Sequence, residues 1–452
     1  MLRKDLNRVL MITLVVGATI GGGIFITPGS LASAGGSGSM VGFIITFIGG
    51  LALAYVFSQL GYSNPVSNGL YEYPKSAFGK FMGATVGWAY WVFMWASTPS
   101  ILIGLAGYLA FWIPAFDSNQ TLIFLVGTVI IWIFTVINLR GIKSGATWGM
   151  WFTIAKLAGI AIFIVIGLTH IHLSNLTPIL PNGPSSILPM LTILMYSFLG
   201  MESAVVMGEE GENKDVVRVG AFYSYIIIAL LYGLVLFVSF GAMPSADLAN
   251  SSKSLVDVSK ITMGGLGQNF IAIIALISIV GGVVSSIPLV GRISLAMARD
   301  GFFPKGMASI NKNGAPHTSL IVGAICSNLL LATVLFKSTK AAFDFTMLIT
   351  TLFGLIPYAL TMVSIIILKV NQPDTYTFAG SRWTKILVAS IVAFIFTGLA
   401  IYGSGAEPAM WALLTIVIAG PALWAYLVLR AHSEAKSAVT KVAVTLTPSG
   451  DD

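Results

Sequence analysis

The sequence predicts an all-α integral membrane protein with twelve transmembrane helices, of which the first and the sixth are broken. Of its 452 residues, 56% are hydrophobic and 9% are charged, against roughly 25% charged residues in soluble domains. Apolar runs long enough to cross a bilayer recur along the whole chain. Gly21, Gly22 and Gly23 interrupt the first run. Because each glycine costs about 1 kcal/mol in a helix interior relative to alanine, the helix is expected to open there.

The predicted segments follow one another with short connections and no soluble appendage. In order they span residues 9–33, 39–62, 81–112, 121–139, 148–169, 187–208, 219–243, 266–298, 318–336, 343–368, 384–403 and 408–429. No small-residue cleavage site ends segment 1, so we expect a retained helix and not a signal peptide. Residues 1–430 therefore form one predicted transmembrane domain. The polar tail, residues 431–452, is predicted to be disordered.

The distribution of basic residues predicts the orientation of the chain. Eighteen Lys and Arg lie in the even-numbered loops and the two tails, and four lie in the opposite loops. This is the positive-inside pattern, so we expect a multi-pass protein of the cell membrane with both termini in the cytoplasm. The net charge of +7 thus reflects topology and not a nucleic-acid-binding surface. The single Cys326 excludes an internal disulfide, and no metal-ligand cluster or cofactor motif is visible.

The glycines of segment 1 have a functional interpretation and a structural one. In a membrane, an opened helix is tolerated only where protein or a water-filled cavity covers the freed backbone groups. Secondary transporters hold substrates at such breaks, since the second half-helix offers free N–H groups and a positive dipole to an anion such as a carboxylate. The structural alternative is a close helix–helix contact through small residues.

Segment 6 carries a second break signal. Ser197, which competes for backbone hydrogen bonds, stands three residues before Gly200, and Glu202 follows two residues after Gly200. Interrupted segments at corresponding positions of two halves predict an inverted repeat with the site between them. The predicted halves are residues 9–169 and 187–368, followed by two extra helices over 384–429.

Two charges lie deep inside the predicted segments. Lys156 is in the middle of segment 5 and Glu202 is in segment 6, whereas Arg292 lies close enough to the end of segment 8 to reach the interface. Charges inside membrane segments are costly and commonly mark ion or substrate pathways. The structural alternative for each of Lys156 and Glu202 is a buried pair or a polar helix contact.

Four motifs occur in order along the chain. They are G-x-x-I-G-G-G-I-F in segment 1, P-V-S-N-G-L-Y-E-Y-P-K-S-A-F-G after segment 2, S-F-L-G-M-E-S in segment 6 and A-M-A-R-D-G-F-F-P after segment 8. Together they resemble the amino acid–polyamine–organocation superfamily of amino-acid transporters. The resemblance implies five-plus-five inverted repeats followed by two extra helices, in agreement with the twelve predicted segments.

The resemblance also implies a substrate site at the two breaks. The α-carboxylate of an amino acid would meet the N–H groups of Gly21, Gly22 and Gly23. The α-amino group would meet carbonyl oxygens of the opened stretches, which are those of Thr19, Ile20, Tyr196, Ser197 and Leu199. The physics agrees independently, because a zwitterion suits one half-helix N-terminus and one set of unpaired carbonyls.

Within the superfamily, the chain is most similar to the arginine/agmatine and ornithine/putrescine antiporters. The shared features are Glu202 and the stretch Y-G-S-G-A-E-P-A-M-W before segment 12. The implied lining residues of the pocket are Tyr90, Thr98, Tyr196, Ser286 and Thr350. Tyr196 and Ser286 stand where the arginine antiporter has tryptophans. Because one aromatic wall of the pocket is lost, a cation–π interaction with the guanidinium of an arginine substrate is less favoured.

Lys156 departs from these antiporters and resembles a lysine of sodium-independent relatives. In that group the ammonium stands where related transporters bind sodium, between segments 1 and 8. Ser285 and Ser286 are the expected hydroxyl neighbours. A fixed cation would exclude sodium by like-charge repulsion, so we expect sodium independence, and whether Lys156 also carries protons stays open.

The function predicted from the sequence is therefore a sodium-independent amino-acid antiporter, which exchanges a cationic amino acid for its decarboxylated amine by alternating access. Segments 1, 2, 6 and 7 would move against segments 3, 4, 8 and 9. A proton-coupled or exchange carrier of neutral amino acids is one alternative, and a membrane amino-acid sensor is another. No nucleophile–base pair points to an enzyme. The expected partners are the amino acid or amine substrate and the lipid bilayer, and a homodimer is left open.

Overall fold

The computed structural model describes residues 6–64, 69–140, 145–208, 211–414, 425–426 and 428–429. The side chains of residues 145–152, Ser285 and Pro288 lie outside that description. All regular structure in the described part is helical, apart from one isolated bridge between Leu6 and Gly211. The prediction of an all-α fold is therefore confirmed.

Each long helix matches a predicted segment. They are α3 (Ser39–Ser63), α5 (Lys80–Leu109), α7 (Gln120–Leu139), α8 (Gly145–Gly167), α11 (Lys214–Ala242), α13 (Ser254–Arg299), α14 (His317–Leu331), α15 (Thr339–Asn371) and α16 (Gly380–Tyr402). Segment 1 is split into α1 (Arg8–Thr19) and α2 (Gly23–Gly35), and segment 6 is split into α9 (Ile187–Phe198) and α10 (Ser203–Val206). Short helices α4 (Glu72–Phe78), α6 (Ala115–Ser118) and α12 (Ser245–Ala249) lie in the connections.

Ten helical stretches of the described chain are long and apolar enough to span a membrane. The chain is thus a multi-pass membrane protein. α1, with 12 residues, is too short to count alone. Residues 415–424 and 427 of predicted segment 12, and the whole tail 431–452, lie outside the described residues.

Segment 8 begins earlier than the sequence predicts. α13 starts at Ser254, and Gly264 interrupts it with a left-handed φ of 68°, so two helices meet there. The first of them carries Asp257 and Lys260, which keep its hydropathy below that of a membrane segment. The predicted start at residue 266 is therefore the start of the apolar part only.

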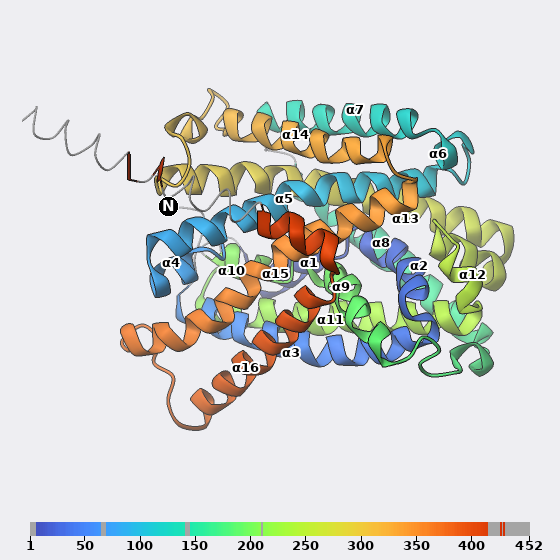
Figure 1. Cartoon of the computed structure of the whole chain (residues 1–452), viewed down its shortest axis with the longest axis horizontal. Coiled ribbons are helices and arrows are strands. Elements are labelled where there is room, and N and C mark those ends of the chain that lie inside the picture. The colour runs from blue at the N-terminus through green and yellow to red at the C-terminus, as the bar shows by residue number, and fades with distance from the viewer. Residues whose placement is uncertain are drawn as a thin grey trace, which may run out of the picture.

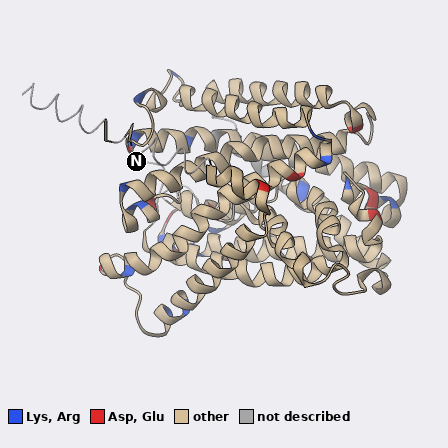
Figure 2. Ribbon diagram, viewed as in Figure 1, with Lys and Arg blue, Asp and Glu red and all other residues tan. Residues whose placement is uncertain are grey.

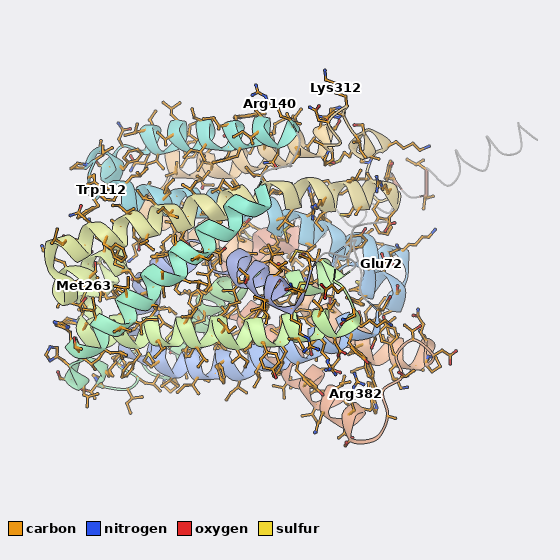
Figure 3. The ribbon with its side chains drawn as sticks, turned by 180° about the vertical axis from the view of Figure 1, so that it is seen from behind. Glu72, Trp112, Arg140, Met263, Lys312 and Arg382 are labelled. Carbon is orange, nitrogen blue, oxygen red and sulfur yellow. The ribbon has the colours of Figure 1, made fainter. Side chains whose placement is uncertain are left out.

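The helices run roughly alongside one another (Figure 1), with α7 and α14 side by side along one edge. α3 packs against α11, α5 packs against α13, and α15 packs against α5. Charged residues gather near the two ends of the bundle, and the long middle stretches carry few (Figure 2). In Figure 3, Glu72, Arg140, Lys312 and Arg382 lie toward one end of the bundle, and Trp112 and Met263 lie at the other.

A clamp outside the membrane segments joins two of the sequence motifs. Lys75 of α4 donates to Asp300 Oδ2 at 2.8 Å and to Glu72 Oε2 at 3.0 Å. Tyr71 donates to the same Asp300 oxygen at 3.1 Å. Burial lowers the pKa of Lys75, but the hydrogen bonds to Asp300 and Glu72 outweigh it and raise the pKa above its usual value. The clamp fixes the loop before α5 to the end of α13.

Candidate functional site

The break in segment 1 exposes two backbone donors. α1 ends at Thr19, and α2 begins at Gly23. The Gly21 N–H donates to the Thr19 carbonyl at 2.9 Å. Among the described residues, the Gly22 and Gly23 N–H groups meet no acceptor. They are therefore free at the N-terminus of α2, where a helix favours an anion.

The break in segment 6 exposes backbone acceptors. Leu199 is extended, with ψ 135°, and Gly200 has a φ of 103°, a conformation that only glycine adopts at little cost. The Gly200 N–H donates to Glu202 Oε2 at 2.9 Å and not to the Tyr196 carbonyl four residues back. The carbonyls of Tyr196, Ser197 and Leu199 consequently have no N–H donor in the described part of the chain.

The two breaks lie against each other. A Cβ added to Gly23 would lie 3.5 Å from Tyr196 Cε1 and 3.6 Å from the Cα of Ser197. A Cβ added to Gly200 would lie 3.2 Å from Thr19 Oγ1. Free donors from α2 and free acceptors from the end of α9 thus meet within one small region, which is buried apart from the half-buried Gly200.

Lys156 lies at the first break. Its side chain is 2% exposed, and its ammonium donates to the carbonyls of Gly17, at 2.6 Å, and of Ile20. These carbonyls belong to the last turn of α1, where a cation is favoured by the helix dipole. The ammonium from α8 therefore caps α1 and holds the opened Ile20 in place.

The hydroxyl that segment 8 brings to the break is Ser278. It donates to the Gly21 carbonyl at 2.9 Å. Ser286, which the sequence suggests for this position, instead lies 3.1 Å from Thr98 Oγ1 and donates to the Val283 carbonyl. The side chain of Ser285 lies outside the described residues. Ser278 lies seven residues before Ser285, on the same helix face. This spacing is the sequence feature that could have identified Ser278.

Glu202 is enclosed by three donors. Its side chain is 1% exposed; Oε1 accepts from Tyr90 at 3.0 Å, and Oε2 accepts from Tyr358 and from the Gly200 N–H. Glu202 and Lys156 take different partners, so they do not pair with each other. Each makes polar contacts with other helices, which was the other structural alternative. Glu202 instead ties the broken segment 6 to α5 and α15.

The remaining lining residues differ in how they are held. The Tyr196 hydroxyl lies 3.0 Å from Ser100 Oγ, and its ring meets Phe343 edge-on with centroids 6.3 Å apart. The Thr350 hydroxyl is fully buried and donates to the Thr346 carbonyl of its own helix at 2.7 Å. Tyr196 is therefore the lining residue whose ring packs against α15.

Tyr232 of α11 was missed by the sequence analysis. Its hydroxyl would be 3.1 Å from a Cβ on Gly23, and the residue is 1% exposed. Ser197 and the backbone of Ile24 lie beside this hydroxyl, but among the described residues no hydrogen bond of good geometry reaches it. The Thr19 hydroxyl is equally buried and unpartnered. Buried polar groups without partners call for a ligand or water, so both extend the candidate site.

Comparisons with known proteins agree with this geometry. A family model described as amino acid permease matches residues 6–429. The chain is 29% identical over 424 residues to an arginine/ornithine antiporter of Pseudomonas aeruginosa, covering 90% of this chain and 87% of the relative. It is 26% identical over 436 residues to an arginine/agmatine antiporter of Chlamydia pneumoniae, covering 92% and 89%. It is 29% identical over 415 residues to a putative arginine/ornithine antiporter of Bacillus subtilis, covering 84% and 88%.

Proposed function

This chain belongs to the amino acid permease family, and from that premise we propose that it is a sodium-independent antiporter of cationic amino acids. The observation that carries the proposal is the pair of facing breaks. The free N–H groups of Gly22 and Gly23 suit an α-carboxylate, and the free carbonyls of segment 6 suit an α-ammonium. The relatives named arginine/ornithine and arginine/agmatine antiporters favour a substrate with a cationic side chain.

Exchange for the decarboxylated amine is the finer form of this proposal. An amine such as agmatine lacks the carboxylate and cannot use the Gly22 and Gly23 donors. It would keep the contact of its cationic group with the pocket. The glycine break is therefore expected to matter more for the amino acid than for its amine.

Neutral amino-acid exchange is the second candidate, because one observation favours it. Glu202 is the acidic residue closest to the breaks in sequence, and its carboxylate already accepts three hydrogen bonds. A cationic side chain would have to replace one of these donors, whereas a neutral side chain would need only the aromatic wall of Tyr196 and Phe343.

The position of Lys156 supports sodium independence. Its ammonium already occupies the Gly17 and Ile20 carbonyls, which would otherwise be acceptors for a cation. A sodium ion placed among these carbonyls would meet a like charge at contact distance, in a site from which water is excluded. Transport is thus expected to proceed without sodium.

The packing of the helices supports an inverted repeat of five-plus-five segments. α1 of segment 1 packs on α11 of segment 7, and α9 of segment 6 packs on α3 of segment 2. α8 of segment 5 packs on α13 of segment 8, and α15 of segment 10 packs on α5 of segment 3. The contact between segments 1 and 7 corresponds to the contact between segments 6 and 2, and the contact between segments 5 and 8 corresponds to the contact between segments 10 and 3. A two-fold relation between the halves, in which segment numbers differ by five, requires this correspondence.

Alternating access is the mechanism that this arrangement favours, with both termini in the cytoplasm. Tyr90 and Tyr358 meet on Glu202 and close the site on the side of α4, which carries the basic loops predicted inside. Tyr108 of α5 donates to the Phe25 carbonyl on the side of α12 and closes the site there. Opening one of these closures at a time would pass the substrate across the membrane.

The test is exchange in proteoliposomes that contain purified protein and preloaded radiolabelled arginine. We expect release in choline or potassium buffer only when arginine, ornithine, lysine, agmatine or putrescine is added outside, and Lys156→Ala should lower that release about tenfold through loss of the cap on α1. Arg140→Gln, which changes a basic charge in a loop, is the matched control.

Other outcomes would replace the proposal. Release without any external substrate would exclude antiport, and a requirement for sodium would exclude the role given to Lys156. Release with leucine alone would favour the neutral carrier. Tight binding of arginine without any release would favour a sensor.

A further inference from the structure

A cluster of polar side chains joins α2 to the first turns of α15, on the side of α12. Ser30 donates to Asp344 Oδ1 at 2.9 Å. One turn away, Lys340 donates to Ser33 Oγ at 2.8 Å and to the Ala249 carbonyl. The sequence places this side outside the cell. The cluster therefore lies at the outer mouth of the site.

Asp344 has no direct ion pair within the cluster, although the nearby charge of Lys340 acts on it through space. Lys340 lies four residues before it on the same helix, yet its ammonium bonds to Ser33 and Ala249, and no salt bridge to Asp344 is found among the described residues. The carboxylate receives one hydrogen bond from a neutral hydroxyl, and its second oxygen has no partner in the described part of the chain. Asp344 is half-buried and so within reach of a solute.

Asp344 lies on the outer side of the candidate site. The preceding residue, Phe343, meets the ring of Tyr196, which lies beside Gly23. Ser30 is seven residues along α2 from Gly23, which corresponds to about 10 Å of helix. A substrate that enters from the outer side would therefore pass Asp344 before it reaches the glycine break.

We propose that Asp344 is an entry subsite for the guanidinium or ammonium group of the incoming substrate. When α2 moves away from α15, the bond from Ser30 breaks, and the carboxylate faces the opened mouth. A cationic side chain then replaces the hydroxyl with a charge-assisted hydrogen bond, which is roughly twice as strong as a neutral one. The inference rests on the proposed exchange of cationic substrates. Asp344 would be the acidic partner for the cationic group of the substrate, since Glu202 is already enclosed by three donors.

The test separates the two faces of the membrane. In right-side-out proteoliposomes loaded with arginine, Asp344→Asn should raise the external KM for arginine and ornithine about fivefold, as expected for a partly exposed ion pair. The KM on the inner face should change less than twofold. Inhibition by external citrulline, which carries a neutral urea in place of the guanidinium, should be unaltered. Asp344→Glu should restore most of the affinity, and Asp344→Ser gives a second neutral variant if Asp344→Asn does not fold.

Two controls distinguish a subsite from a simple latch. Ser30→Ala breaks the same hydrogen bond but keeps the charge, so it should not raise the external KM. Asp257→Asn makes the same charge change on the same side, where Asp257 accepts from Ser251 in the loop before α13, and it should also leave the KM within twofold.

The subsite would be overturned if Asp344→Asn and Ser30→Ala changed the external KM equally, or if Asp344→Asn and Asp344→Ser both left it unchanged. In either case, exchange of arginine by the wild type would still support the proposed function. Absence of arginine exchange in the wild type would overturn both, and it would be seen before any variant is made.

Discussion

At the residue scale, the three glycines of the first break are not equivalent. Among the described atoms outside its own chain neighbours, nothing lies within 4 Å of a Cβ added to Gly21. A Cβ on Gly22 would lie 3.2 Å from Ile279 Cγ1, and one on Gly23 would lie 3.1 Å from the Tyr232 hydroxyl. A side chain at Gly22 or Gly23 would therefore press on its neighbour, whereas Gly21 borders open space.

This difference makes Gly21→Ala a cleaner test than Gly22→Val. We expect Gly21→Ala to fold with wild-type thermal stability and to weaken amino-acid binding about tenfold, because its methyl group would occupy space beside the carboxylate site, where glycine lets a ligand approach the backbone. Gly22→Val should lose both binding and stability, since it also presses on α13. Isothermal titration with arginine and agmatine, together with thermal unfolding, measures both effects. If Gly21→Ala bound arginine as tightly as the wild type does, the carboxylate site would lie elsewhere.

At the element scale, α15 makes one contact on each side of the site. α15 carries Asp344 near its outer end and Tyr358 fourteen residues later, about 21 Å along the helix axis. Tyr358 bonds to Glu202 of segment 6, and Asp344 bonds to Ser30 of α2. A tilt of α15 that lengthens one contact can shorten the other, so this helix is placed to make the two closures exclusive.

Tyr358→Phe tests the inner closure. It removes one donor to a buried carboxylate, which should destabilise the protein by about 2 kcal/mol. The inner closure should then open more often, so that one-way release of preloaded substrate from inside rises. Tyr108→Phe is the matched control on the outer side, because it removes a hydrogen bond to the neutral Phe25 carbonyl. Thermal unfolding and efflux without external substrate are the measurements. The closure would be dispensable if Tyr358→Phe showed wild-type stability and no added release.

The elements were more predictable than their contacts. Hydropathy locates the long helices to within a few residues, apart from the start of α13. The glycine run and Gly200 locate both breaks, because backbone energetics are local. The partners of the break depend on packing between distant segments. For this reason the sequence indicated Lys156 but not Ser278, and Tyr232 gave no signal beyond being a tyrosine within an apolar segment.

At the scale of the whole molecule, the contacts describe a state in which the site is closed toward both sides. The hydrogen bonds from Tyr90 and Tyr358 to Glu202 hold the inner side. Ser30, Ser33 and Lys340 hold the outer side together with Asp344. Transport requires that these sets break in turn, since a protein open on both sides would leak.

Alternating access predicts that locking the outer closure stops exchange. In a Cys326→Ser background, Ser33→Cys and Lys340→Cys can be joined by a short, reducible bis-methanethiosulfonate reagent, because the side chains they replace lie in contact. Exchange in proteoliposomes should fall at least about tenfold on cross-linking and should return on reduction, as expected for a lid that must open in each cycle. Each single cysteine variant, treated with the same reagent, is the control for modification without a link. Full exchange by the cross-linked protein would mean that α2 and α15 do not separate during transport. The outer path would then have to open between other helices, and an entry subsite at Asp344 would not lie on it.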